Sequence, residues 1–186
     1  FLYETLICQV QADGGIALAC ALSGIAATLL PGGVTAHKLT SAPPNVCADT
    51  ASKVGAHTGQ AALLRAADII VWDEASMTPK DLFDYADRVL QDLTGNRGVP
   101  FGGKVVVIGG DFRQVLPVVP FGGRAEIIAA TLQMHYTWRQ NLFHIYIYQT
   151  RLTTAILRIN NYLSRSINTA LAGAPSHPSS LICLLY

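Results

Sequence analysis

The sequence predicts an α/β fold with a mainly parallel sheet flanked by helices. Two short runs, 69–72 and 105–108, are wholly apolar and mostly β-branched, which is typical of strands buried on both faces of a sheet. A third apolar run covers residues 16–21, and segments with helical spacing of apolar residues lie between these runs. Strands that alternate with helices along a chain indicate a parallel sheet.

The expected elements can be placed in order from their start and stop signals. They are a helix at 1–10 that ends near Asp13-Gly14-Gly15, a strand at 16–21, a short helix at 25–30 that ends at Pro31-Gly32-Gly33, a helix at 61–67, strands at 69–72 and 105–108, and a long helix from residue 78 that ends near Gly95. The first helix has no N-cap, which suggests a truncated chain. Residues 47–60 are expected to be irregular and exposed.

The long helix is expected to have Thr78 as its N-cap and Pro79 as its first helical residue. Its buried stripe is predicted to contain Leu82, Phe83, Ala86, Val89, Leu90 and Leu93. Asp84, Asp87, Arg88 and Asp92 are expected on the solvated face, where solvation alone explains them.

Composition and charge set limits on function. The 186 residues are 51% hydrophobic, so one domain with a buried core is expected. The net charge of +1 argues against a generally basic surface that coats nucleic acid. Residues 1–100 hold 6 basic and 10 acidic residues, a balance of −4, whereas residues 101–186 hold 7 and 2, a balance of +5. This asymmetry is weak support for a phosphate-facing second half.

The cysteines and apolar spans exclude several classes. Cys8, Cys20, Cys47 and Cys183 form no Cys-x-x-Cys pair and have no histidine at ligand spacing, so we expect free or buried thiols in a reducing compartment. No signal peptide is expected. The apolar piece 16–30 is broken at Ser23 and is shorter than the roughly 20 residues that cross a bilayer, so no membrane contact is expected.

Asp73 and Glu74 directly follow the strand at 69–72. The carboxyl ends of parallel strands form the edge where open α/β sheets bind ligands. Two adjacent acids repel unless a positive group lies near them. We therefore predict a Mg²⁺–nucleotide site, with Asp73 in the metal shell and Glu74 polarising a water. A solvated loop that opens the next helix is the alternative.

Asp111 and Gln114 follow the strand at 105–108 and should reach the same sheet edge. An uncharged Gln there could hydrogen-bond a γ-phosphate oxygen or the attacking water. A surface position for Gln114 is the alternative, which two strands ending together make less favourable.

Two groups of polar residues that follow the predicted strand at 16–21 could contact nucleic acid. The Ser23-Gly24 turn offers backbone N–H groups to a phosphate, and Thr35, His37 and Lys38 suit sugar and phosphate contacts. For a single histidine near a helix start, a structural hydrogen bond is the common alternative.

Five blocks together resemble the Pif-type (petite integration frequency) ATP-dependent DNA helicases, in the variant of plant genomes and helicase-bearing transposons. The blocks are Leu22-Ser23-Gly24-Ile25-Ala26-Ala27, Thr35-Ala36-His37, Trp72-Asp73-Glu74-Ala75-Ser76-Met77, Phe101-Gly102-Gly103-Lys104 and Gly109-Gly110-Asp111-Phe112-Arg113-Gln114-Val115-Leu116-Pro117. The last is the sharpest. The resemblance covers roughly residues 1–152, a partial motor domain, and leaves residues 153–186 as an unmatched tail, partly irregular.

The resemblance implies a RecA-like P-loop NTPase domain, truncated at both ends, that uses ATP and Mg²⁺ for 5′-to-3′ movement on single-stranded DNA. It implies roles in DNA repair, recombination and telomere maintenance, and a nuclear location with the mitochondrion as the alternative. Asp73 matches the magnesium ligand, Glu74 the catalytic carboxylate and Gln114 the γ-phosphate sensor. Ser23, Gly24, Thr35 and His37 match blocks implied to touch DNA.

Arg151, in Tyr148-Gln149-Thr150-Arg151-Leu152, resembles the family's γ-phosphate arginine, although the family usually has Asn-Met before it. A surface Arg is the alternative.

Two features of the family are absent from the sequence. The phosphate loop, GxxxxGK[ST], should end just before Phe1, so this polypeptide alone is predicted not to hydrolyse ATP measurably. The second RecA-like domain, expected in the full-length parent, is also missing, and residues 181–186 are an apolar end without an evident partner.

Two other interpretations stay open. One is a non-enzymatic, degenerate α/β module that binds single-stranded DNA or a partner. The other is a different P-loop ATPase, which the Gln114-containing block argues against.

Overall fold

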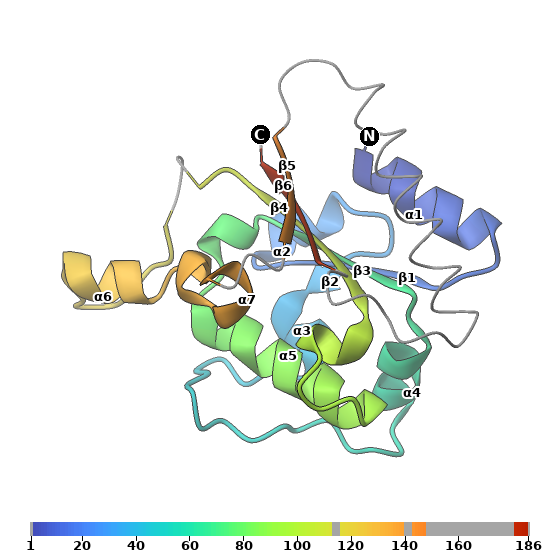
Figure 1. Ribbon diagram of the computed structural model, residues 1–186, viewed down its shortest axis with the longest axis horizontal. Coiled ribbons are helices and arrows are strands. Elements are labelled where there is room, and N and C mark those ends of the chain that lie inside the picture. Colours follow the sequence, from blue (N-terminus) through green and yellow to red (C-terminus); the bar gives the residue numbers. More distant parts are fainter. Residues whose placement is uncertain (1, 113–115, 140–142, 148–180, 186) are drawn as a thin grey trace.

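The structure, a computed structural model, describes residues 2–112, 116–139, 143–147 and 181–185 (Figure 1). Six parallel strands form one sheet in the order β2-β1-β3-β4-β6-β5. In chain order they are β1 Ala17–Ala21, β2 Val34–Thr35, β3 Ile69–Asp73, β4 Val105–Gly110, β5 Phe143–Ile147 and β6 Leu181–Leu185. The predicted α/β class with a parallel sheet is confirmed.

Helices connect the strands and cover the sheet. They are α1 Leu2–Ala12, α2 Gly24–Thr28, α3 Ala36–Thr40, α4 Gly59–Ala66, α5 Lys80–Thr94, α6 Arg124–Ala129 and α7 Tyr136–Arg139, with 3₁₀ turns η1 Ala75–Met77, η2 Pro100–Gly103 and η3 Leu132–Met134. The helices predicted at 1–10, 25–30, 61–67 and from residue 78 all exist, with ends shifted by one or two residues.

Strand β3 shows why its sequence has no polar alternation. Ile69 and Val71 pack with α1 and α2 on one face of the sheet, and Ile70 and Trp72 pack with α3, α4 and α5 on the other. Figure 1 shows α1 and α5 on opposite sides of the strands. Because successive side chains of a strand point to opposite faces, a strand covered on both faces must be apolar throughout.

The start of α5 differs from the expected one. Pro79 is the N-cap and α5 begins at Lys80, so the prediction of Thr78 as N-cap was wrong by one position. Thr78 is fully buried, and its hydroxyl instead accepts a hydrogen bond from Nε1 of Trp72 at 3.1 Å. The buried indole N–H needs a partner, and Thr78 is the residue within reach.

The apolar end of the chain has partners, which corrects the expectation for residues 181–186. Strand β6 lies between β4 and β5 and pairs with both, Cys183 being opposite Ile108 and Ile145. The pairing supplies backbone hydrogen-bonding partners along one side of β4, whose six residues are all buried. The division between residues 1–152 and 153–186 stays a prediction.

Two smaller expectations concern thiols and membranes. Among the residues with described side chains, Cys8, Cys20 and Cys47 are free thiols, as expected, and burial raises the pKa of the Cys20 thiol. Within the described segments, every helix is too short or too polar to cross a bilayer.

Candidate functional site

The candidate site lies at the carboxyl edge of the sheet, where β3 ends at Asp73 and Glu74 follows. Asp73 is in register with Ala21 of β1, and Ala21 is in register with Thr35 of β2. On the other side, β4 follows the register of β3 up to Trp72 and Ile108. The ends of β2, β1, β3 and β4 therefore meet at one edge, as the sequence predicted for the two acids.

Glu74 turns the chain at this edge. Its backbone is left-handed, with φ 52° and ψ 36°, which costs a non-glycine residue roughly 1–3 kcal/mol. The Glu74 amide donates a hydrogen bond to Oδ1 of Asp73 at 2.9 Å, which orients that carboxylate. Such strain is typical of residues held in place for function.

The pKa of Glu74 is raised, first by burial and then by the negative charge of Asp73. Both effects disfavour the charged form of the carboxyl group. A raised carboxyl pKa brings the group closer to neutral pH, where a general base works best. Asp73 and Glu74 are both half-buried, so each remains open to solvent at the edge.

The two glycines that end β4 allow close packing beside the acids. A Cβ on Gly110 would lie 2.9 Å from the amide nitrogen of Ser76 in η1, and a Cβ on Gly109 would overlap the hydroxyl of Tyr3. Larger residues here would push η1 and α1 away from the strand. Asp111, half-buried, comes next, so the structure places it at the same edge as Asp73 and Glu74.

Asp73 fits a magnesium ligand because Mg²⁺ is commonly held by one or two carboxylates, with phosphates and waters completing the octahedron. In the described part of the chain, no group of three or more His, Cys, Asp or Glu side chains forms a metal site by itself.

Gln114 and Arg151 lie outside the described residues. The predicted grouping of Gln114 with the two acids, and the role of Arg151, thus stay predictions.

The residues expected to touch DNA lie at the ends of β1 and β2. The Ser23 hydroxyl accepts from the amide of Ala26 at 3.1 Å, and the Thr35 hydroxyl accepts from that of Lys38 at 3.2 Å, so both residues cap short helices. Each hydroxyl keeps its own proton to donate. His37 is half-buried, and burial lowers the pKa of its imidazole, which favours the neutral form.

Gly98 to Lys104 matches GxxxxGK but continues with Val105 where the phosphate loop needs Ser or Thr. The segment leads into β4, whereas a phosphate loop follows a strand and opens a helix. The ammonium group of Lys104 donates to the carbonyls of Arg65 and Ala67 (2.9 Å to Ala67), at the end of α4. Lys104 therefore anchors α4 and does not act on phosphate.

A buried polar network was missed by the sequence reasoning, which put Asp87 on the solvated face. Asp87 is 3% exposed. Its Oδ1 accepts from the amide of Phe101 at 2.5 Å and from Nε2 of Gln91 at 2.9 Å, and its Oδ2 accepts from the hydroxyl of Tyr136 at 2.7 Å. The network ties α5 to η2 and α7. Burial, and then the bond to Asp87, raise the pKa of the Tyr136 phenol.

A second part of this network surrounds His135, which is fully buried. Nδ1 of His135 accepts from the amide of Thr137 at 3.3 Å, so the proton of a neutral ring is on Nε2, 2.9 Å from Oδ1 of Asp84. Lys80 contacts the other oxygen of Asp84 at 2.9 Å. Burial alone would raise the pKa of Asp84, but the close contacts with His135 and Lys80 outweigh it and the pKa is lowered.

Helical spacing could have revealed Asp87, since it lies four residues after Phe83 and three before Leu90, in the middle of the apolar stripe. The partners of Asp87 in η2 and α7 have no comparable signal in the sequence.

The chain is similar to known helicases in both sequence and structure. A family model described as PIF1-like helicase matches residues 1–162. The human ATP-dependent DNA helicase PIF1 is 31% identical over 155 residues, an alignment that covers 75% of this chain and 23% of the human protein. The protein of the same name from Trypanosoma brucei brucei is 48% identical over 48 residues, 26% of this chain and 5% of that protein.

Solved structures show the same likeness. Bacteroides Pif1 bound to single-stranded DNA gives a TM-score of 0.54 at 31% identity, over 63% of this chain and 28% of that one. The Bacteroides Pif1 complex with ADP-AlF3 and single-stranded DNA gives a TM-score of 0.60 at 26% identity, over 73% of this chain and 33% of that one. The chain thus spans at most about a third of the length of each of these relatives.

Proposed function

Because the chain belongs to the PIF1-like helicase family, we propose that it forms part of the first motor domain of an ATP-dependent DNA helicase. The observation that carries this proposal is the pair Asp73 and Glu74 at the carboxyl edge, next to the ends of β1 and β4. The proposed substrates are ATP and single-stranded DNA. The proposed direction is 5′ to 3′, with roles in DNA repair, recombination and telomere maintenance, and a nuclear or mitochondrial location.

In the proposed mechanism, Asp73 would hold Mg²⁺, and the ion would supply positive charge next to the phosphates. Glu74 orients the attacking water and accepts its proton, a task for which a raised pKa suits a carboxylate. Asp111 follows β4 at the same edge, and Gln114, three residues later in the sequence, is proposed to contact the γ-phosphate or the water. Arg151 stabilises the charge that develops on the transferred phosphoryl group.

Ser23, Gly24, Thr35 and His37 are proposed to contact the DNA backbone, since they follow β1 and β2 at the same edge. Hydroxyl groups and backbone amides are among the groups that contact phosphates, and such contacts fix the register of the nucleic acid without reading its sequence. A neutral His37 would contribute a hydrogen bond rather than a charge.

One observation favours a second function for the 186-residue chain by itself. The pattern GxxxxGK[ST], which supplies backbone amides and a lysine to the phosphates, does not occur in this sequence. A module that binds single-stranded DNA without ATP turnover is therefore the second candidate.

Fluorescence polarisation with a labelled single-stranded oligonucleotide separates these functions, with and without a non-hydrolysable ATP analogue. For a longer protein that includes this chain and a phosphate loop, affinity that changes with the nucleotide supports the motor. If the affinity of that protein for the oligonucleotide does not change with the nucleotide, the result supports the binding module. If neither the longer protein nor the 186-residue chain binds DNA, both proposed functions are contradicted.

A further inference from the structure

The loop between β4 and α6 presents one aromatic ring entirely to solvent. Phe121 has a relative exposure of 110%, and Val118 of the same loop has 81%. Ile25 and Leu29 are also exposed, at 82% and 75%, but among the exposed large apolar side chains of the described residues Phe121 is the one aromatic ring. A ring with both faces open is suited to a planar ligand.

The backbone holds this ring outward. The carbonyl of Val119 accepts from the amide of Gly122 at 3.1 Å, with Pro120 and Phe121 between them. Phe121 has φ 59°, so the loop has the arrangement of a type II turn, whose third residue is normally glycine. Val119 is folded against Gly122, because a Cβ on Gly122 would lie 2.6 Å from Cγ1 of Val119. The turn therefore holds Phe121 in a left-handed conformation that is strained for phenylalanine and that a glycine would adopt without strain.

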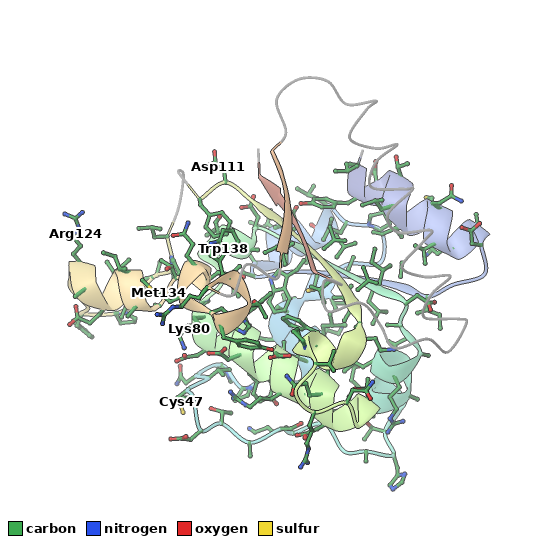
Figure 2. All side chains as sticks on the ribbon, in the orientation of Figure 1. Cys47, Lys80, Asp111, Arg124, Met134 and Trp138 are labelled. Carbon is green, nitrogen blue, oxygen red and sulfur yellow. The ribbon has the colours of Figure 1, made fainter. Side chains whose placement is uncertain are left out.

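Arg124 is the described basic residue nearest to the ring in sequence, three positions after Phe121. An acidic residue is also near, because the side chain of Glu126 lies close to Gly122 and Gly123. Arg124 is exposed, and Figure 2 shows it at the outer end of α6, pointing away from the body of the molecule. An aromatic ring with neighbouring arginine is the combination by which proteins hold single-stranded nucleic acid, through stacking on bases and attraction to the backbone.

The loop also starts at the edge of the sheet where the candidate site lies. It leaves the sheet at the carboxyl end of β4, the edge that carries Asp73 and the ends of β1 and β2. A single strand of nucleic acid that crosses this edge of the sheet could thus extend to the loop.

We propose that Phe121 is a stacking platform for a base of single-stranded nucleic acid, with Arg124 beside it for the adjoining phosphate. The proposal rests on the proposed DNA-binding function and adds to it a contact outside the residues already assigned.

The test compares F121A, F121W and F121L with the unchanged 186-residue chain, using a fluorescein-labelled oligo-dT of about 16 nucleotides. A strand of equal length with abasic positions in its centre is the second ligand, and V118A is the matched control in the same loop. F121A should weaken binding of oligo-dT about 5- to 100-fold and F121L nearly as much, while F121W and V118A bind as the unchanged chain does. The abasic strand should bind F121A and the unchanged chain equally.

The outcomes separate the two levels of the proposal. Equal binding of oligo-dT by F121A and the unchanged chain would overturn the stacking role of Phe121 and would favour a protein partner for the loop. The proposed binding of DNA by the chain would not be affected by that result. An equal loss with the abasic strand would also overturn stacking. If the unchanged chain binds neither ligand, its proposed DNA binding fails as well. Because Phe121 is exposed, melting temperatures should agree among all variants, which excludes misfolding as the cause.

Discussion

Asp73 and Glu74 are the residues on which the proposed chemistry depends. Glu74→Gln in a longer protein that includes the phosphate loop should lower the rate of ATP hydrolysis by about 10²- to 10⁴-fold, because the amide cannot accept a proton. Asp73→Asn should abolish turnover by weakening the metal site. Steady-state phosphate release with saturating DNA measures both effects.

Binding of single-stranded DNA in the absence of ATP is the control for these two variants and should be unchanged. Turnover that survives both substitutions would show that the catalytic carboxylates lie elsewhere.

Asp87 and Asp92, both on α5, give a matched pair for stability. Asp87→Ala should lower the free energy of unfolding by about 2–4 kcal/mol, because it leaves the amide of Phe101 and the hydroxyl of Tyr136 without their acceptor. Asp92→Ala, which removes only an exposed ion pair with Arg97, should change it by less than about 0.5 kcal/mol. Urea denaturation followed by circular dichroism measures both values. Equal effects would mean that Asp87 is solvated, as the sequence analysis expected, and not part of a buried network.

Among the helices, the contact of α5 with His135 predicts a dependence of stability on pH. The pKa of Asp84 is lowered in the folded state, so its contribution is present above the unfolded pKa of about 4 and is lost as pH falls through the folded value. Asp84→Asn keeps an acceptor for His135 but removes the charge that faces Lys80.

The stability difference between Asp84→Asn and the unchanged chain should therefore be about 1 kcal/mol at pH 7 and should shrink as pH falls below about 4. Thermal or urea unfolding across this range tests it, with Asp81→Asn as a control because Asp81 lies 3.3 Å from the same ammonium group and is more exposed. A difference that is constant with pH would exclude an electrostatic cause.

Strand β6 is tested by a single position. Cys183 lies in register with both neighbours of its strand, so Cys183→Pro should destabilise the chain by more than about 1 kcal/mol by removing a backbone donor from the interior of the sheet. Cys183→Val, which keeps the amide, is the control. Identical melting temperatures for the two variants would show that residues 181–185 do not belong to the sheet.

At the level of the whole chain, the absent GxxxxGK[ST] pattern predicts the behaviour of the 186 residues in isolation. Purified protein should release no phosphate from ATP above background, with or without DNA, because no loop or lysine holds the phosphates. A coupled phosphate assay measures this. DNA-stimulated release would mean that other residues take over the role of the loop.

Much of the fold was predictable because it depends on short-range patterns. Fully apolar runs marked β1, β3 and β4, glycine stops marked the ends of α1 and α2, and the alternation of strands and helices indicated parallel pairing. The edge position of Asp73 and Glu74 followed from the same pattern, since parallel strands end on one side.

What the local sequence could not indicate were the contacts between distant segments. Asp87 meets Tyr136 across 49 positions, and β6 joins a strand more than 70 residues earlier in the chain. A polar residue on a helix is solvated or buried according to what covers it, and an apolar terminal run gains a partner only where a sheet edge is open. Periodicity and spacing therefore indicate which residues meet at the carboxyl edge of the sheet, while packing in three dimensions decides which polar groups, such as Asp87 and Tyr136, are buried between distant segments.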